Sequence, residues 1–215
     1  MNITGRRILP TEETRVEIVV VNSRFIAIAA PVATVEDARF IITRVRGEFP
    51  DASHHVPAYV IGFGTSTLEH CSDDHEPAGT AGRPVLGVIK GSGLGDIIIV
   101  VTRYFGGTKL GTGGLVRAYT LAAQAVLEKT PLAEKVATVS FQITIPYSYY
   151  DRFKRASEQE SVHLLDEVFS DQISIKAVMN DHSFEAFRKT LQEMTNGSVE
   201  PLIIERNPNS IFPIR

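Results

Sequence analysis

The pattern of hydrophobic and polar positions predicts strands and helices in mixed order over the first 131 residues. Residues 15–32 carry alternating and β-branched positions on both sides of an Asn-Ser turn signal, which is typical of a hairpin. Residues 34–49 place apolar side chains at helical spacing behind a threonine cap. The continuous apolar run at 96–102 predicts a central strand covered on both faces, and 115–130 predicts a long helix.

Three more segments complete this first part. Residues 54–64 predict another strand, and residues 83–92 predict a short helix that starts near a proline and ends at a glycine. Residues 65–84 are polar and dense in turn formers, so we expect a long loop there. Its last part, "EPAGTAGRP", is a Gly-rich turn, for which a structural role is favoured over an anion-binding one.

The pattern restarts after residue 131, which indicates a second domain. We place a linker at 132–135 between domains at 1–131 and 136–206. The second domain runs strand, helix, strand, strand, helix, strand, the order of a ferredoxin-like split unit with two helices on one face of an antiparallel sheet. Residues 207–215 have two prolines and no period, and we leave them as an unassigned tail. The sequence therefore predicts a two-domain α+β protein.

Composition excludes several classes of protein. A hydrophobic fraction of 43% and a charged fraction of 22% indicate a globular chain rather than a disordered one. The single cysteine leaves no internal disulfide and no four-cysteine zinc site. The longest apolar run is far below the roughly 20 residues of a membrane helix, and the start of the chain has no apolar secretion signal. We therefore expect a cytoplasmic protein with no membrane partner and no cofactor, whose oligomeric state the sequence leaves open.

Charges of opposite sign are segregated within the first domain. The net charge of −3 gives no reason to expect a generally basic surface. However, residues 47–82 hold six acidic residues and no Lys or Arg, whereas residues 97–127 hold Arg103, Lys109 and Arg117 and no acidic residue. Two loops of opposite sign result, which either face each other or face a ligand.

The densest polar cluster is "EHCSDDHE", residues 69–76. A metal site needs three or four ligands that converge on one point, and neighbouring side chains in an extended loop point apart. We therefore favour a solvated acidic loop over a metal site, although His54 and His55 would be available to complete one. Cys71 has histidines nearby in sequence but no helix N-terminus directly after it to lower its pKa, so a small packing residue is favoured over a nucleophile.

The Gly-rich segment "GGTKLGTGG", residues 106–114, is the strongest local feature. It lies between the predicted central strand and a long helix, where free backbone N–H groups and the helix dipole favour an anion such as phosphate. It matches neither the P-loop nor the dinucleotide-binding pattern. Two interpretations stay open: a phosphate site supported by nearby cations, or glycines that only permit tight turns and close packing.

Two longer strings resemble the signature of the IMPACT family, whose bacterial members are called YigZ-like. They are "DDHEPAGTAGRPVL" at 73–86 and "VVTRYFGGTKLGTGGLVRAY" at 100–119, supported upstream by "SRFIA" and "HHVPAYVIG". The family usually has Gly and Ser where this chain has His75 and Ala78, which puts in doubt a role for a hydroxyl at position 78 and leaves Thr80 as the nearby one. His70, Cys71 and His75 look particular to this chain, so the resemblance makes a family-wide metal or cysteine site improbable.

The resemblance also implies a fold and a function. It implies an N-terminal domain similar to the second domain of ribosomal protein S-five and a C-terminal domain similar to the last domain of elongation factor G. Eukaryotic members regulate translation in the amino-acid starvation response by competing for a ribosome-associated activator of a protein kinase. Bacterial members lack that partner domain.

We therefore expect a non-enzymatic regulator of translation that binds RNA or the ribosome, with a protein partner in translation as a further option and with no catalytic residue assigned. The residues expected to contact phosphate are Arg103, Gly106, Gly107, Lys109, Gly111, Gly113, Gly114, Arg117 and Thr80. The alternative is an enzyme in which Asp73, Asp74 and Glu76 form a cation-binding or polar surface beside the Gly-rich loop, so that Mg²⁺ and a phosphorylated small molecule or nucleotide meet there. A pure protein-binding module with structural glycines is the third option.

Overall fold

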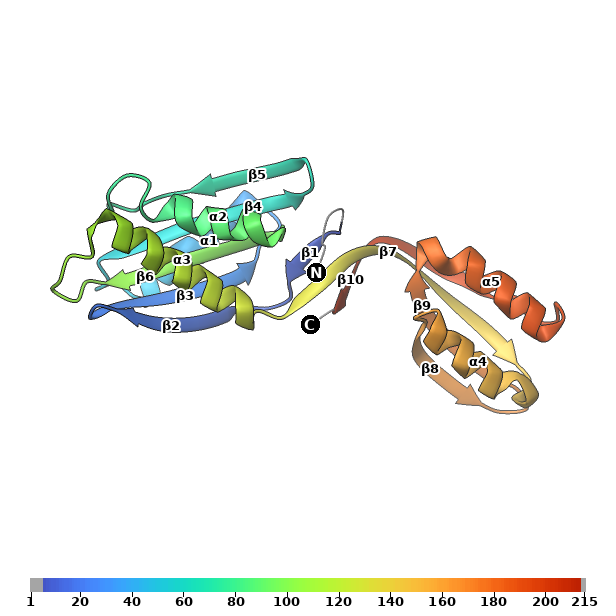
Figure 1. The fold of residues 1–215 in the computed structure, drawn as a ribbon. Coiled ribbons are helices and arrows are strands. Elements are labelled where there is room, and N and C mark those ends of the chain that lie inside the picture. The colour runs from blue at the N-terminus through green and yellow to red at the C-terminus, as the bar shows by residue number, and fades with distance from the viewer. Residues whose placement is uncertain (1–5, 214–215) are drawn as a thin grey trace. The chain divides into compact units, whose positions relative to one another are not determined.

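The computed structural model describes residues 6–213, and the chain divides into two units. The first unit is made of two segments, one that ends at Glu134 and one that begins at Phe212. The second unit is Lys135–Ile211. None of the helices within residues 6–213 is long and apolar enough to cross a membrane. The two-domain α+β architecture expected from the sequence is confirmed, and each unit is described below by itself (Figure 1).

A five-stranded antiparallel sheet forms the centre of the first unit, in the order β2-β3-β6-β4-β5. Its strands are β2 (Thr14–Val20), β3 (Ser23–Pro31), β4 (His54–Phe63), β5 (Ser66–Cys71) and β6 (Ile97–Tyr104). The predicted apolar run is indeed the central strand β6, where side chains on both faces are buried. The predicted hairpin is β2–β3, with its two-residue turn at Val21 and Asn22, both at positive φ. Positive φ at both positions matches the twist of the flanking strands.

Helices cover both faces of this sheet. On one face lies α1 (Val35–Glu48), which packs against Ile98 and Val100 of β6. Its N-terminus is fixed by a capping box in which Thr34 accepts from Asp37 N while the Asp37 carboxylate accepts from Thr34 N. On the other face lie α2 (Gly82–Ser92) and α3 (Gly111–Lys129).

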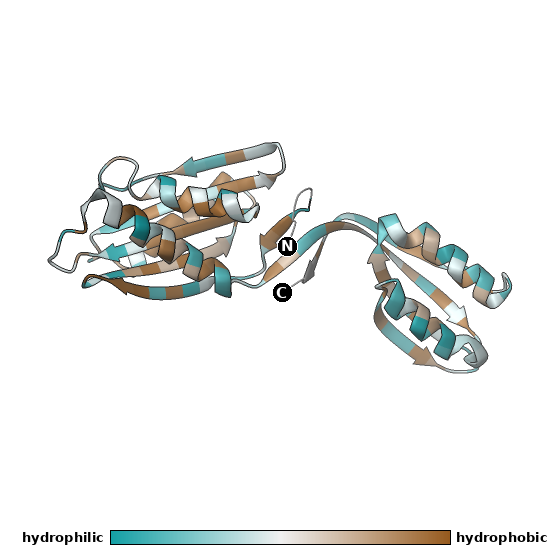
Figure 2. Cartoon of the chain, viewed as in Figure 1, coloured by the Kyte–Doolittle hydropathy of each residue, from teal (hydrophilic) through white to brown (hydrophobic). Residues whose placement is uncertain are grey.

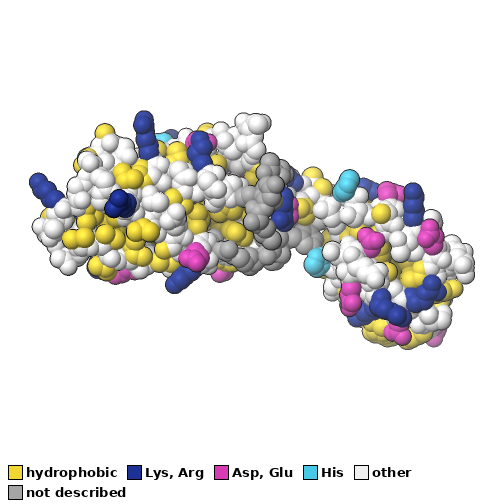
Figure 3. Space-filling view, viewed as in Figure 1, with side chains coloured by type: hydrophobic (Ala, Val, Ile, Leu, Met, Phe, Trp, Pro, Cys, Tyr) yellow, Lys and Arg dark blue, Asp and Glu magenta, His cyan; other side chains and the backbone are white. Residues whose placement is uncertain are grey.

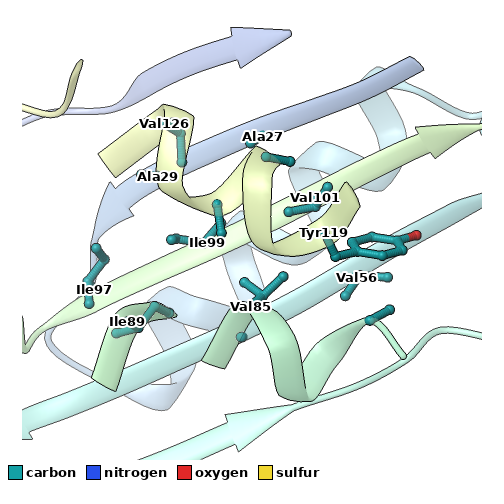
Figure 4. Packing of buried hydrophobic residues seen from close by; sticks show 14 of the residues in the cluster. Ala27, Ala29, Val56, Val85, Ile89, Ile97, Ile99, Val101, Tyr119 and Val126 are labelled. Atoms are coloured by element: carbon teal, nitrogen blue, oxygen red, sulfur yellow. The ribbon is translucent and has the colours of Figure 1, made fainter. Parts of the chain in front are cut away.

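The core under α2 and α3 is shown in Figure 4. Val85 and Ile89 of α2 and Tyr119 and Val126 of α3 point toward Ile99 and its neighbours on β6. All five of these side chains are fully buried. This packing holds the N-terminal ends of both helices in fixed positions over the sheet.

The second unit contains the predicted β-α-β-β-α-β order. The elements are β7 (Leu132–Ile145), α4 (Tyr147–Gln159), β8 (His163–Phe169), β9 (Ile173–Asn180), α5 (Asp181–Thr195) and β10 (Leu202–Pro213), and the first residues of β7 and the last residues of β10 belong to the first unit. The sheet order is β1-β7-β9-β8, where β1 is Ile8–Pro10, β10 also pairs with β7, and both helices pack around Phe141, Phe153, Phe184 and Phe187. Hydrophobic and hydrophilic residues alternate along its strands and helices (Figure 2), as expected for elements with one buried side.

Three segments differ from the expectation. The polar stretch predicted as a loop contains β5, an edge strand that pairs with β4. The residues predicted as a linker begin β7, because 132–134 pair with the short strand β1 (Ile8–Pro10). The tail predicted from residue 207 continues β10 to Pro213, while 214–215 lie outside the described residues. In each case the strand conformation depends on pairing with a neighbouring strand, which the local side-chain pattern does not predict.

Candidate functional site

Two loops at one end of the first unit carry most of the candidate residues. The first follows β5 and leads to α2, and the second joins β6 to α3 (Figure 1). A direct ion pair connects the acidic loop to the end of strand β6: Arg103 Nη1 donates to Glu76 Oε1 over 2.6 Å. The segregated charges of the sequence therefore meet inside the fold at this point.

Arg103 lies inside the unit and is only 4% exposed. Besides Glu76, its Nη2 donates to Ser23 Oγ at 3.3 Å, and its guanidinium lies 5.5 Å from the ring centre of Phe25 and 5.6 Å from that of Phe105. We expected Arg103 to contact a phosphate at the surface, and the structure differs. The guanidinium holds the β2–β3 turn, the acidic loop and the Gly-rich loop together.

Glu76 and Tyr119 complete this buried network. The Glu76 side chain is 4% exposed, and Tyr119 Oη donates to Glu76 Oε1 at 2.8 Å. Burial, followed by the negative charge of Glu76, raises the pKa of Tyr119 far above its ordinary value. Tyr119 is therefore protonated at neutral pH and serves as a hydrogen-bond donor to Glu76. His54 Nε2 lies 3.7 Å from the same carboxylate oxygen.

Asp73 caps helix α2 from outside the helix. Its Oδ1 accepts from the backbone N–H groups of Ala81 and Gly82 at 3.1 and 2.8 Å, and its Oδ2 accepts from Gly79 N at 2.8 Å. Burial alone would raise the pKa of Asp73, but these three hydrogen bonds outweigh it and hold the pKa below the ordinary value. The chain's own carboxylate therefore fills the anion-binding position at this helix N-terminus, in keeping with the structural role favoured for the Gly-rich turn.

Thr80 also has an internal role in this turn. Its side chain is buried, and Oγ1 donates to the backbone carbonyl of Pro77 at 2.6 Å. We expected Thr80 to offer its hydroxyl to a ligand, whereas the structure uses the hydroxyl to close the turn before α2.

The three carboxylates of the acidic loop bind separate partners. Asp74 accepts from the His55 backbone at 2.6 Å and from Arg46 Nη2 at 2.7 Å, while Asp73 and Glu76 are used as described above. Within residues 6–213 no group of three or more His, Cys, Asp or Glu side chains is arranged to hold a metal ion. The carboxylate surface proposed for Mg²⁺ is therefore not assembled in this structure.

His70 and Cys71 are the last two residues of strand β5. The His70 ring stacks on Tyr59 at 5.1 Å between ring centres. Burial, followed by the charge of Asp73, raises the pKa of the Cys71 thiol, which makes it a poorer nucleophile at neutral pH. Nothing in this arrangement activates the cysteine.

Two cations on and beside the Gly-rich loop lie at the surface. Lys109 and Arg117 are exposed, and Lys and Arg side chains project from this end of the first unit in Figure 3. Helix α3 begins at Gly111, with no side-chain cap and no acidic residue in its first turn. Gly113 and Gly114 lie in that first turn, so its free N–H groups are not screened by bulky side chains.

At three positions of the Gly-rich segment the backbone geometry favours glycine. A Cβ at Gly106 would overlap the backbone of Asn22 in the β2–β3 turn, and Gly106 N donates to Ser23 Oγ at 3.2 Å. Gly107 adopts a φ of +82°, which side chains disfavour. Gly111 likewise has a positive φ, of +70°.

Sequence reasoning missed three residues of the site: Ser23, Tyr119 and Phe105. Tyr119 carried a signal, because a tyrosine at a buried helical position needs a partner for its hydroxyl. Ser23 gave none, since it reaches the site through strand pairing that the local pattern does not encode.

Asp73 provides a test of the α2 cap. Asp73→Asn should lower the free energy of unfolding by about 1–2 kcal/mol at pH 7, because an amide N–H₂ would face one of the three backbone donors. The pKa is lowered in the folded state, so the stabilisation is complete above the unfolded pKa of about 4 and is lost as pH falls further. Urea unfolding at pH 7 and pH 3 should therefore show a difference between wild type and variant that shrinks in acid, and an equal difference at both would contradict the assignment.

Comparison with known proteins places the chain in a family. Residues 21–127 match the Impact N-terminal domain, and residues 143–198 match a domain of unknown function, DUF1949. An IMPACT family member of Haemophilus influenzae is 38% identical over 85% of this chain and 89% of its own length. The IMPACT family member YigZ of Escherichia coli is 34% identical over 85% of this chain and 90% of its own length. A crystal structure of a hypothetical protein is 32% identical, covers 93% of this chain and 98% of that one, and has a TM-score of 0.60. The resemblance seen in the two signature strings is confirmed, and the chain belongs to the IMPACT family.

Proposed function

We propose that this protein is a non-enzymatic, cytoplasmic regulator of translation that binds RNA or the ribosome through the β6–α3 loop. The observation that carries the proposal is the pairing of exposed Lys109 and Arg117 with the uncapped N-terminus of α3. Free backbone N–H groups and the positive end of the helix dipole favour phosphate, and the two cations add sequence-independent attraction.

The neighbouring acidic loop does not oppose this attraction. Asp73 is held by backbone N–H groups, Asp74 by Arg46 and Glu76 by Arg103. Each carboxylate thus has a partner of opposite charge or polarity within the unit, which reduces its field at the β6–α3 loop. A polyanion therefore meets a locally positive end on a chain whose net charge is −3.

The test is binding to purified ribosomes and to labelled RNA over a salt series. Lys109→Ala/Arg117→Ala should weaken binding about tenfold or more at low salt and reduce the slope of log affinity against log salt by about 1 for each lost phosphate contact. The matched control is Arg39→Ala/Lys129→Ala, which removes the same charge from exposed positions on α1 and at the far end of α3. The control should bind as the wild type does.

Two results would refute the proposal. One is the absence of wild-type binding to ribosomes and to RNA at low salt. The other is an equal loss in both double variants, which would indicate a general charge effect instead of a site. Retained folding of each variant is checked by circular dichroism.

A further inference from the structure

Phe105 is an aromatic side chain held at the surface where the Gly-rich loop begins. It directly follows β6, and 47% of its surface is exposed. Singly exposed hydrophobic side chains are common on protein surfaces, so the exposure of Phe105 gains meaning only from its neighbours. Because Phe105 lies next to the proposed phosphate site, a ligand bound at that site would also contact the ring.

The structure fixes Phe105 in place. Its backbone N–H donates to Ser53 Oγ at 3.1 Å, and the next residue, Gly106, donates to Ser23 Oγ at 3.2 Å. The ring lies against the guanidinium of Arg103, 5.6 Å from ring centre to Cζ, and Arg103 is itself fixed by Glu76. A ring that is already ordered loses little conformational freedom when a ligand packs on it.

The surroundings of the ring suit a nucleotide chain. Lys109 is four residues further along, so the two side chains start no more than about 14 Å apart. The uncapped N-terminus of α3 begins two residues after Lys109. An aromatic face beside cations and free backbone N–H groups is the combination with which proteins bind bases and phosphates of a single strand.

We propose that Phe105 is a stacking platform for an unpaired base, and that the ligand of the β6–α3 loop is single-stranded RNA. This inference rests on the proposed function and makes it more specific. In a duplex the base faces are already stacked inside the helix, so an exposed ring would gain nothing from them. The cation–π contact with Arg103 helps to hold the ring in the orientation that a stacked base would need.

Affinity measurements on single-stranded and duplex RNA of the same length test the proposal. Phe105→Leu keeps an apolar side chain but removes the aromatic face, and it should weaken single-strand binding at least about fivefold while leaving any duplex binding unchanged. Phe105→Tyr should bind single strands as the wild type does. The control is Phe40→Leu on α1, where the ring is 67% exposed on the other face of the sheet.

A fluorescence experiment reports on stacking directly. The chain contains no tryptophan, so Phe105→Trp introduces a unique probe. A base stacked on the indole should quench its emission on addition of single-stranded RNA, whereas Phe40→Trp should not respond. The probe reads contact at position 105 even where the change in affinity is small.

The outcomes separate this inference from the proposed function. If Phe105→Leu binds single strands as the wild type does and the Phe105→Trp emission stays constant on binding, the stacking role is overturned while RNA binding stands. A wild-type protein that binds neither form of RNA at low salt overturns the inference, and one that also fails to bind ribosomes overturns both. If Phe105→Leu instead loses binding only to a protein of the ribosome and not to RNA, the ring docks a protein and the inference is wrong.

Discussion

Arg103→Met is expected to lower the free energy of unfolding of the first unit by about 3–5 kcal/mol. The change removes the positive partner of Glu76 and leaves a carboxylate that is 4% exposed with only Tyr119 and the more distant His54 beside it. It also removes the cation that lies against Phe25 and Phe105. The loss of stability arises chiefly from the unpaired Glu76 carboxylate, so it should be smaller when Glu76 is also replaced by a neutral residue.

A double variant separates that cause from lost packing. Arg103→Met/Glu76→Gln removes both charges and should regain most of the lost stability, because replacing a whole buried pair is often nearly neutral. Arg103 Nε is buried without a hydrogen-bond partner among the described residues, so the native pair is itself incompletely satisfied. If the double variant is as unstable as the single one, the ion pair is not the origin of the effect.

Hydrogen exchange of backbone amides in β6 and α3 is the measurement, with the second unit as an internal reference. Protection in Lys135–Ile211 should stay unchanged, since the network lies within the first unit. Arg24→Met serves as the matched control, because Arg24 pairs with Glu17 at the surface, where both side chains are almost half exposed. Such pairs contribute at most about 1 kcal/mol.

Elements with a clear hydrophobic pattern of their own were predictable from the sequence. The run at 97–101 is continuously apolar and rich in β-branched residues, as expected of a central strand, and its side chains are buried on both faces. The β5 strand was not predictable in this way, because most of its side chains are exposed. Its strand conformation comes from pairing with β4 at the edge of the sheet, as does the start of β7 from pairing with β1.

In the candidate site, too, features set by the local pattern were predictable and long-range pairing was not. Lys109 and Arg117 were expected to be exposed, and they are, because Arg117 lies out of phase with the buried positions Leu115 and Tyr119 of α3. Arg103 was expected beside them, but its place at the end of β6 directs it toward Glu76, 27 residues earlier. A sequence shows that opposite charges are present but not that two of them pair inside the fold.

Gly106 and Gly113 look alike in the Gly-rich segment of the sequence, but the structure predicts opposite effects on stability when each is replaced by alanine. At Gly106 a Cβ would overlap the backbone of Asn22, and that backbone is part of a tight turn that cannot move freely. At Gly113 nothing lies within 4 Å of an added Cβ, and the residue sits in the first turn of α3. Steric conflict should dominate at the first position and helix propensity at the second.

Gly106→Ala should therefore destabilise the first unit by about 1–3 kcal/mol, as overpacking does, while Gly113→Ala should be neutral or stabilise it by up to about 1 kcal/mol. Urea unfolding compares the two, and each is the control for the other because the chemical change is the same. If RNA binds at this loop, Gly106→Ala should also lose affinity, since displacing Gly106 breaks its bond to Ser23 and moves Phe105 off Arg103. Equal effects of the two substitutions on stability would mean that the approach of the loop to the β2–β3 turn does not position the site.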